Sequence, residues 1–499
     1  MTNGTDIKPK DNSALGFLFI VALALFLRLT FVFLTDNFSG VLPAQRIVYA
    51  QQLQFKAADY GILDPFIPPL YPYVLRAWLG ICHDIISAPR LLAVLLGMLT
   101  LVPFFLIVKL VKGKDSALLA MLLLAVSPLH IIYSTLSLED MPFYCVIFYA
   151  LYFFLRYQCE SKAMRYLALS AVLTSCSFGF RFEGLLYAIL LSAILVAGKN
   201  KKPFFLFASV SFLLPLAWML VCIFKFGDPL FSYTWHAYYS RLNQLGGCRL
   251  ECVIEKITRV FSLPLLLFGG VGFLISLKDV RMRVLNIIFV SFVTAFSIKI
   301  AGGTLSWDPK YFLTFGLFLV IYEAVGLLYF FDDFKSQHTQ ALFISILCIY
   351  AVLFGVKYIT NQDTIAQSFS LPLEIKNIPA LLGDTAADKQ ILIDTDYMNW
   401  YPEHIIVGTG LAAHRFKIAD EIEVFGHRVK KGQGLAKCKS HLLNLMGNGR
   451  FAYIVYAPEG RSLRFIDPLF LQEEHIGKVT YRRIFSGRIY WVYKLEESE

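Results

Sequence analysis

Long apolar stretches separated by short polar segments dominate the first three quarters of the chain. Eleven of these stretches are almost free of charge, and they fall at residues 15–34, 91–111, 118–133, 143–156, 166–178, 185–197, 204–224, 261–277, 285–300, 312–331 and 341–358. A bilayer core about 30 Å thick is crossed by about 20 helical residues, because each residue adds about 1.5 Å. The pattern therefore predicts a polytopic all-α membrane protein with about eleven transmembrane helices.

After residue 372 the pattern changes to short runs rich in β-branched and aromatic residues. Two runs lie at 390–395 and 451–457, and two more, at 478–485 and 488–495, flank Ser486 and Gly487, which suits a hairpin. Residues 437–449 have helical spacing and end in glycine. We predict a small extracytoplasmic α/β domain at 373–499, a linker at 360–372, and a membrane domain at 1–359 that includes a long first outer loop at 36–90.

Lysine and arginine gather in every second loop between the predicted spans, at residues 109–114, 156–165, 199–202 and 278–283. Short loops rich in these residues stay on the cytoplasmic side of membrane proteins. The N-terminus is therefore predicted to be cytoplasmic. The loops at 36–90 and 226–259 and the C-terminal domain are predicted to face the extracytoplasmic side.

Composition agrees with this class of protein. The chain has 57% hydrophobic and only 16% charged residues, which is more apolar surface than one water-soluble core can bury. Its net charge of +10 comes mainly from the inner loops and the tail, and no nucleic-acid-binding module is recognisable, so no nucleic-acid partner is expected. The basic tail is either a solvated face or a surface for anionic lipids or acidic glycans.

Charged side chains near a bilayer are costly, so those at the outer helix ends are candidate functional residues. They are Asp36, Arg46, Glu139, Asp140, Arg181, Glu183, Asp228 and Lys310. If the spans form one bundle, these groups converge on one extracytoplasmic cavity.

The segment Ser137–Asp140, which we call the SLED segment, presents two adjacent carboxylates before an apolar run. Asp140, two residues before Pro142, suits a helix N-cap. Adjacent helical side chains diverge by about 100°, so Glu139 is expected to have a separate role.

Two further pairs each allow a structural and a functional interpretation. Arg181 either forms a local ion pair with Glu183 or binds a phosphate. Lys310, beside Tyr311, either anchors a helix at the membrane interface or provides a second phosphate contact.

The first outer loop is expected to contain a helix. Residues 44–58 place Ile47, Ala50, Leu53 and Ala57 at helical intervals among polar neighbours, which suits a helix lying in the plane of the interface. Prolines at positions 65, 68, 69 and 72 then interrupt the chain before a second short helix.

Five segments carry a family resemblance. They are IPPLYP (67–72), SPLHIIYSTLSLEDMPF (127–143), FRFEGLL (180–186), FGDPLF (226–231) and DPKYFL (308–313). Each is weak alone, but in their order and sidedness they resemble the GT-C superfamily of membrane glycosyltransferases. The nearest group is that of the dolichyl-phosphate-mannose protein mannosyltransferases and the aminoarabinose transferases, which the small outer α/β domain also resembles.

The resemblance implies a cell-envelope glycosyltransferase in the plasma (inner) membrane. It would move a sugar from a polyprenyl-phosphate lipid to a hydroxyl of a lipid, glycan or protein acceptor at the extracytoplasmic side. A carboxylate would take the acceptor proton, and cations would stabilise the departing phosphate. We expect the catalytic residues to be Asp36, Glu139 and Asp140, the donor-phosphate contacts Arg46, Arg181 and Lys310, and the substrate contacts Glu183 and Tyr311. No cofactor is expected, with a divalent metal as the alternative.

The first outer loop departs from the family pattern, in which an Asp precedes a small residue by eight positions. With Ala50 as the small residue, Leu42 occupies the position of the acid. Either Asp36 or Asp64 then supplies the base, or a carboxylate of the SLED segment acts alone, or the protein is an inactive binding subunit.

A lipid or solute transporter is the other alternative. Transporters place polar residues at mid-membrane in broken helices and contain internal repeats. In this sequence the charges crowd one face and no repeat is visible, which favours the transferase.

Overall fold

The computed structural model describes most of the chain, in two compact units. The described residues are 13–34, 41–55, 68–160, 162–234, 257, 261–301, 310–331, 336–360, 373–382, 389–394, 402–411, 413–418, 443–458, 473–476 and 478–496. The first unit comprises residues 1–34, 63–71 and 90–365, and the second comprises 35–62, 72–89 and 366–499. The domain boundaries expected from the sequence stay a prediction.

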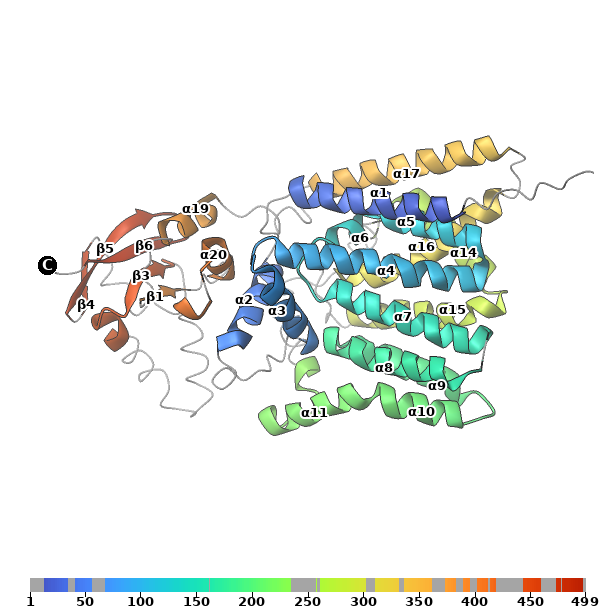
Figure 1. The fold of residues 1–499 in the computed structure, drawn as a ribbon, viewed down its shortest axis with the longest axis horizontal. Coiled ribbons are helices and arrows are strands. Elements are labelled where there is room, and N and C mark those ends of the chain that lie inside the picture. The colour runs from blue at the N-terminus through green and yellow to red at the C-terminus, as the bar shows by residue number, and fades with distance from the viewer. Residues whose placement is uncertain are drawn as a thin grey trace, which may run out of the picture. The chain divides into compact units, whose positions relative to one another are not determined.

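The first unit is a bundle of helices, and each of the eleven apolar runs coincides with a helix or a broken pair of helices (Figure 1). These are α1 (Ser13–Leu34), α4 (Ala88–Lys112), α5 (Lys114–Val126) with α6 (Pro128–Tyr133), α7 (Asp140–Cys159), α8 (Met164–Phe180), α9 (Gly184–Val196), α10 (Lys202–Ser211) with α11 (Leu213–Phe226), α14 (Leu263–Ser276), α15 (Arg283–Ala301), α16 (Lys310–Phe331) and α17 (Gln337–Thr360). A short 3-10 turn, η1 (Val280–Met282), precedes α15.

Four described helical segments are long and apolar enough to cross a membrane, namely Ala14–Leu34, Ala88–Lys112, Val280–Lys299 and Tyr311–Phe331. A fifth span results if α10 and α11, which meet at 42°, count as one broken span. The chain is thus an integral membrane protein with a mostly helical fold. The number of eleven spans stays a prediction.

Proline explains why the predicted run at 118–133 is two helices. Pro128 is the first residue of α6 and has no N–H to donate to the preceding turn. Ser127 takes an extended conformation, and its N–H bonds to the Leu124 carbonyl at 3.2 Å. The chain therefore changes direction at Ser127, and α6 leads on to the SLED segment.

Glycines bring α14 and α16 into close contact. A Cβ on Gly272 would lie 1.8 Å from the Tyr322 carbonyl oxygen and 2.7 Å from the Gly326 nitrogen. A Cβ on Gly326 would lie 2.1 Å from the Phe268 carbonyl oxygen. Backbone meets backbone at these positions, so only glycine allows this separation of the two helices.

The second unit contains α2 (Val41–Phe55), most of α3 (Leu70–Cys82), α19 (Leu373–Leu382), α20 (Pro402–Thr409), the 3-10 turn η3 (Ala413–Arg415) and a sheet. The helix expected at 44–58 is present as α2. It packs against α20 and η3, and its residues Ala44, Ile47, Val48 and Ala50 are buried. This face of α2 is therefore covered by protein, whereas the sequence predicted that it lies in the membrane interface.

The sheet has the strand order β2-β1-β3-β6-β5-β4. Its strands are β1 (Gln390–Ile393), β2 (Phe416–Ile418), β3 (Phe451–Tyr456), β4 (Glu473–Ile476), β5 (Val479–Ser486) and β6 (Trp491–Glu496). β1 pairs in parallel with β2 and β3, and the other pairs are antiparallel. The four predicted strands and the hairpin are thus confirmed, whereas the short strands β2 and β4 were not predicted. Of the helix predicted at 437–449, residues 443–447 are helical, and 437–442 lie outside the described part.

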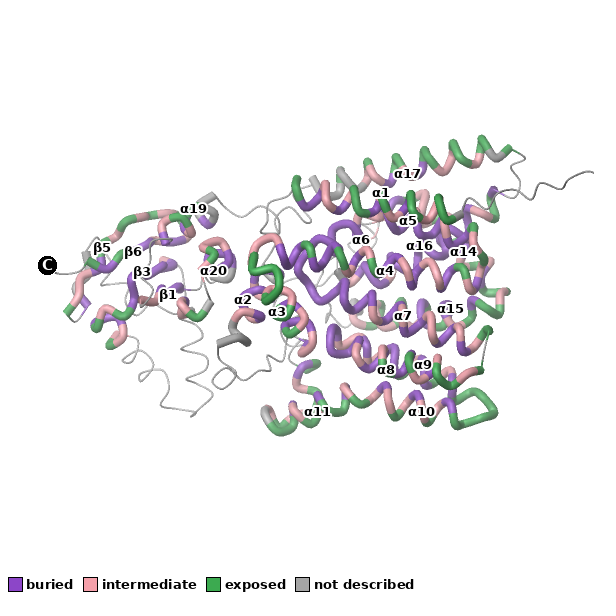
Figure 2. The backbone as a smooth tube through the Cα atoms, in the orientation of Figure 1, coloured by how far each residue is buried: buried purple, intermediate pink, exposed green. Residues whose placement is uncertain are grey.

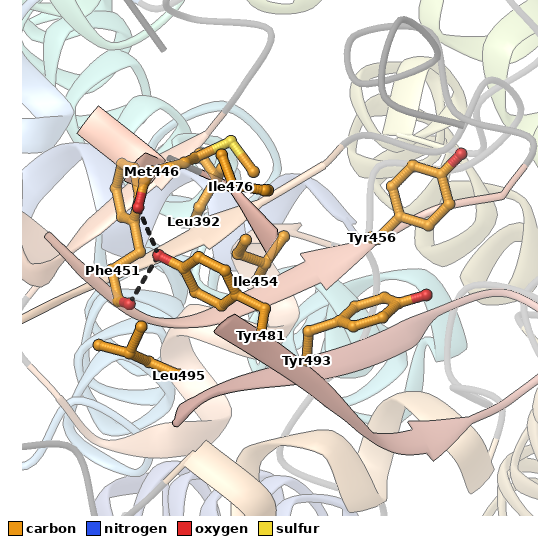
Figure 3. Close-up of a cluster of buried hydrophobic side chains, with 9 residues drawn as sticks. All are labelled: Leu392, Met446, Phe451, Ile454, Tyr456, Ile476, Tyr481, Tyr493 and Leu495. Carbon is orange, nitrogen blue, oxygen red and sulfur yellow. Dashed lines mark hydrogen bonds between the residues drawn. The ribbon is translucent and has the colours of Figure 1, made fainter. Parts of the chain in front are cut away.

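A buried cluster of apolar and aromatic side chains forms the core of this sheet (Figure 3). The hydroxyl of Tyr481 lies within hydrogen-bonding distance of the carbonyl oxygens of Met446 (3.2 Å) and Phe451 (3.1 Å) and shares its single proton between them, which ties β5 to β3 and to the residues before it. In the first unit, most residues of α5, α6, α7 and α16 are buried, whereas most of the described side chains of α17 are exposed (Figure 2).

Candidate active site

A tight turn joins α8 to α9 and presents two of the predicted site residues. Arg181 is the C-cap of α8 in an extended conformation, and Glu183 is the N-cap of α9. The N–H of Gly184 bonds to the Arg181 carbonyl at 3.0 Å. A Cβ on Gly184 would lie 2.4 Å from the Phe178 nitrogen, so glycine is required where α9 turns back against α8.

Arg181, Glu183 and Asp140 form an ion cluster at this end of the bundle. The guanidinium donates to Glu183 through Nη2 at 2.6 Å and through Nε at 3.2 Å. Its Nη1 donates to Oδ1 of Asp140, which the start of α7 brings beside α8. The side chains of Asp140 and Arg181 are 1% and 7% exposed, and that of Glu183 is 32% exposed. Solvent therefore reaches the cluster mainly at Glu183.

This geometry shows the structural alternative for Arg181, whereas its predicted role as a phosphate contact stays a prediction. Arg181 and Glu183 form the local ion pair, and Asp140 joins them from 41 residues earlier in the chain. The interpretation of Asp140 as a helix N-cap is wrong. Glu139 is the N-cap residue of α7, no side chain caps this helix, and the Asp140 carboxylate turns toward Arg181 instead.

The ion cluster lies beside aromatic rings of α7 and α9. The Arg181 guanidinium carbon is 5.7 Å from the centre of the Phe143 ring, a separation typical of a cation–π contact. Phe143 also contacts Tyr187, whose buried hydroxyl forms no hydrogen bond with any residue that the structure describes. Tyr144 bonds across to Thr314 of α16 at 2.6 Å. The Arg181 guanidinium of the cluster is therefore packed against aromatic side chains.

Three long-range contacts fix the approach to the SLED segment. The Tyr71 hydroxyl bonds to Ser137 Oγ at 2.9 Å. Arg90 donates to the Thr135 carbonyl at 3.2 Å and to the Val32 carbonyl at 3.1 Å. Because all of these groups are buried, the backbone before Glu139 and Asp140 has little freedom to move.

The pKa of Glu183 responds to opposing influences. Burial alone raises it, but the Arg181 charge and hydrogen bonds, with a further contribution from Lys299, lower the pKa to about 2. Glu183 is therefore ionised under physiological conditions.

The low pKa of Glu183 predicts an acid-sensitive contribution to stability. The folded-state pKa of about 2 lies below the ordinary value of 4.5, so this contribution is complete above about pH 4.5 and is lost as the pH falls toward 2. We expect the thermal midpoint of the purified protein to fall more steeply between these limits than that of Glu183→Gln. Glu160→Gln, which alters an exposed pair with Arg156, should keep the slope of the unsubstituted protein. Equal slopes for Glu183→Gln and the unsubstituted protein would contradict the assignment.

The other predicted site residues lie outside the described part of the chain or on other elements. Asp36 and the alternative base Asp64 lie outside the described residues, as does the side chain of Lys310 at the start of α16. Tyr311 is half-buried on α16. Arg46 is buried on α2 in the second unit, where its Nη1 donates to Gln45 at 3.2 Å.

Lys299 is a site residue that the sequence did not single out. It lies in the last turn of α15, its charge acts on Glu183, and its Nζ is 5.3 Å from the centre of the Tyr233 ring. In the sequence it stands inside an apolar run. Its position near the predicted outer end of that run could have identified it, because burying a lysine charge close to the bilayer is costly and such residues usually have a function.

A divalent metal ion is usually held by several carboxylate, histidine or cysteine ligands. In the described part of the chain there is no group of three or more such side chains placed to share an ion.

Comparison with known families supports the resemblance seen in the sequence. Residues 67–223 match the family model described as dolichyl-phosphate-mannose-protein mannosyltransferase. This stretch includes the SLED segment and the turn with Arg181 and Glu183, so the recognition of this family is confirmed for the part that holds the ion cluster. No curated protein sequence matches the chain.

Solved structures of two kinds have a similar fold. ArnT from Cupriavidus metallidurans bound to undecaprenyl phosphate matches with a TM-score of 0.66 and 13% identity, over 96% of this chain and 97% of that one. The oligosaccharyltransferase from Archaeoglobus fulgidus in the apo form matches with a TM-score of 0.56 and 14% identity, over 89% and 69%. The oligosaccharyltransferase AglB from the same organism, in complex with an inhibitory peptide and a dolichol-phosphate, matches with a TM-score of 0.51 and 12% identity. The match covers 89% of this chain and 69% of that one. At these identities the likeness establishes a GT-C-like fold.

Proposed function

We propose that the protein is a membrane glycosyltransferase that moves a sugar from a polyprenyl-phosphate lipid to an acceptor hydroxyl. The observation that carries the proposal is the buried ion cluster of Asp140, Arg181 and Glu183 in the part that matches the mannosyltransferase family. The similar structures of ArnT and AglB, seen with undecaprenyl phosphate and dolichol-phosphate, support a donor of this class.

The net charge of the cluster suggests a separate role for each of its three residues. One guanidinium and two carboxylates leave a net charge of −1, so the cluster by itself repels a phosphate. We propose that Asp140 and Glu183 hold Arg181 in place, and that Glu183, which is the most exposed of the three, accepts hydrogen bonds from sugar hydroxyls. The phosphate contacts then come from Lys299 and Lys310, with Arg46 as a further candidate.

The transfer step forms a bond between the acceptor oxygen and the anomeric carbon and breaks the bond from that carbon to the phosphate. The acceptor proton passes to a carboxylate, and the polyprenyl phosphate leaves with the bonding electron pair. Oδ1 of Asp140 already accepts a hydrogen bond from Arg181, and the side chain is only 1% exposed, so Asp140 is poorly placed to receive the acceptor proton. We therefore propose Glu139 or Asp36 as the base.

The membrane side follows from the distribution of Lys and Arg. We propose an N-terminus in the cytoplasm, a C-terminal domain on the extracytoplasmic side of the plasma membrane, and an acceptor that is a lipid, glycan or protein. We propose transfer without a metal cofactor. Activity that disappears with a chelator and returns with a divalent ion would contradict this part.

The assignment of the base predicts a large kinetic effect. Glu139→Gln and Asp36→Asn should separate the candidates, because loss of the true base lowers turnover by about 100-fold to 10,000-fold while donor binding persists. Purified protein with a set of labelled polyprenyl-phosphate sugars provides the measurement. Tyr311→Phe, which removes a hydroxyl of a predicted substrate contact, should raise the KM more than it lowers kcat. Full turnover in Glu139→Gln, Asp36→Asn and Asp140→Asn alike would refute general-base catalysis by these residues.

An inactive donor-binding subunit is the second candidate function. Leu42, where the family pattern has an acid, is the observation in its favour. This alternative predicts that the protein binds a polyprenyl-phosphate sugar but transfers none of it under any acceptor condition, and the same assay decides between the two.

A further inference from the structure

Glu323 is a carboxyl group in the interior of the helical bundle. It lies on α16, roughly 20 Å along the helix axis from Lys310, since each residue adds about 1.5 Å. Glu323 is 3% exposed, and no hydrogen bond or ion pair with another described residue satisfies it. An ionisable side chain within a membrane span is costly, so its presence there points to a function.

Glu323 lines a cavity of about 40 Å³. The cavity is enclosed by the break that separates α5 from α6 and by the helices α14, α16 and α17. Its polar lining residues are Ser127, Ser262 and Glu323, and the apolar ones include Phe261 and Phe354. The buried hydroxyl of Ser262 also finds no hydrogen-bond partner among the residues that are described. A water-sized particle needs about 10–15 Å³ of such space, so the cavity admits a small ion with one or two waters.

Glycine residues make room for this cavity. A Cβ on Gly316 would lie 3.0 Å from Cε1 of Phe261, in the cavity wall. A Cβ on Gly269 would lie 2.4 Å from Leu319 Cδ1 and 3.4 Å from Glu323 Cγ. Small residues at both positions therefore let α14 pack closely while the Glu323 side chain keeps its place.

Polar side chains next to Glu323 in the bundle are hydrogen-bonded to one another. The hydroxyl of Tyr322 donates to Oδ1 of Asn286 at 2.9 Å. Asn286 in turn donates to the Ser276 carbonyl at 3.0 Å and accepts from the Ser276 hydroxyl at 2.9 Å. Glu323 and Ser262, by contrast, have no hydrogen-bond partners among the described residues. This difference indicates that a ligand occupies the cavity between them.

We propose that this cavity binds one monovalent cation, supplied either as Na⁺ or K⁺ or as a small protonated amine. The Glu323 carboxylate provides the single negative charge, and the hydroxyls of Ser262 and Ser127 provide oxygen ligands. The rings of Phe261 and Phe354 favour a cation over an anion. Broken helices such as α5–α6 are where membrane proteins bind small cations, whereas a divalent ion prefers several carboxylates. The site contains no predicted reacting group, so it goes beyond the proposed transferase function.

Cation-dependent unfolding of the full-length protein in detergent tests the site without any donor lipid. The thermal midpoint is measured in chloride salts of Na⁺, K⁺, methylammonium or choline at equal ionic strength, choline being too large for the cavity. Ligand at about 100 times its Kd lowers the apparent unfolding constant roughly 100-fold, so at least one small cation should raise the midpoint above that in choline. The Na⁺, K⁺ and methylammonium arms distinguish an inorganic ion from an amine.

Glu323→Gln should abolish the cation-dependent shift, and Ser262→Ala should weaken it by raising the cation concentration at half-effect. Glu160→Gln, which removes an exposed carboxylate elsewhere, is the matched control and should keep the full shift. If Glu323→Gln does not fold, binding of radioactive Na⁺ to Ser262→Ala and the unsubstituted protein gives the same comparison. Equal midpoints in all four salts, or an undiminished shift in Glu323→Gln, would overturn the proposal and leave the transferase assignment untouched.

Discussion

Replacing Arg181 by methionine is expected to lower the free energy of unfolding by about 3–5 kcal/mol and to abolish sugar transfer. The substitution keeps much of the side-chain volume but removes the charge between Asp140 and Glu183. Asp140 is almost fully buried, so its carboxylate would then lack both solvent and a counter-charge. Thermal or denaturant unfolding of the purified protein measures the loss.

Two further variants separate this buried-charge effect from a general effect of losing an arginine. Arg482→Met removes an exposed pair with Glu496 (3.4 Å) and should cost less than about 1 kcal/mol. Adding Asp140→Asn to Arg181→Met should restore part of the lost stability, because it removes the unpaired carboxylate. An Arg181→Met protein as stable as the Arg482→Met protein would show that the ion cluster is not desolvated.

Gly272→Ala is expected to destabilise the bundle by about 3 kcal/mol, at the upper end of ordinary overpacking. The added methyl group would lie 1.8 Å from the Tyr322 carbonyl oxygen, and a backbone atom cannot rotate away. Helices α14 and α16 would have to separate along their contact. Thermal unfolding in detergent measures the effect.

Gly270→Ala is the matched control for that substitution. It lies on the same helix two residues away, and no atom of another described element lies within 4 Å of the position of its Cβ. Alanine also favours the helical conformation over glycine by up to about 1 kcal/mol, so this variant should be as stable as the unsubstituted protein or slightly more stable. Equal destabilisation by both substitutions would mean that helix contact is not the cause.

The positions of the helices could be predicted from the sequence because length and lack of charge suffice to mark a helix in an apolar solvent. Breaks within helices were harder to predict. Pro128 divides α5 from α6, although the apolar run passes through it without interruption. The strands β1, β3, β5 and β6 carry clear runs of β-branched and aromatic residues. β4 reads Glu-Glu-His-Ile and was missed, because pairing with β5 defines it and its own residues do not favour a strand.

The candidate site was only partly predictable for a similar reason. The pairing of Arg181 with Glu183 is local and could be expected from their spacing. The contact with Asp140 depends on α7 packing against α8, which no local pattern encodes. The expectation that charges crowd one face was also incomplete, since Glu323 and Arg28 lie inside the bundle. Both stand within apolar runs, where the overall hydrophobicity conceals a single charge.

Arg28 illustrates what such a charge means for biosynthesis. On α1 it is fully buried, and it donates to the carbonyls of Ala24 (2.7 Å) and Ala125 (3.2 Å) and contacts Nδ1 of His130. The ribosome makes Ala125 and His130 about a hundred residues after Arg28. The first helix must therefore enter the membrane, or wait at the translocon, with a guanidinium whose insertion costs about 2.5–3.5 kcal/mol. Stable insertion of the nascent chain should consequently depend on emergence of the α5–α6 segment.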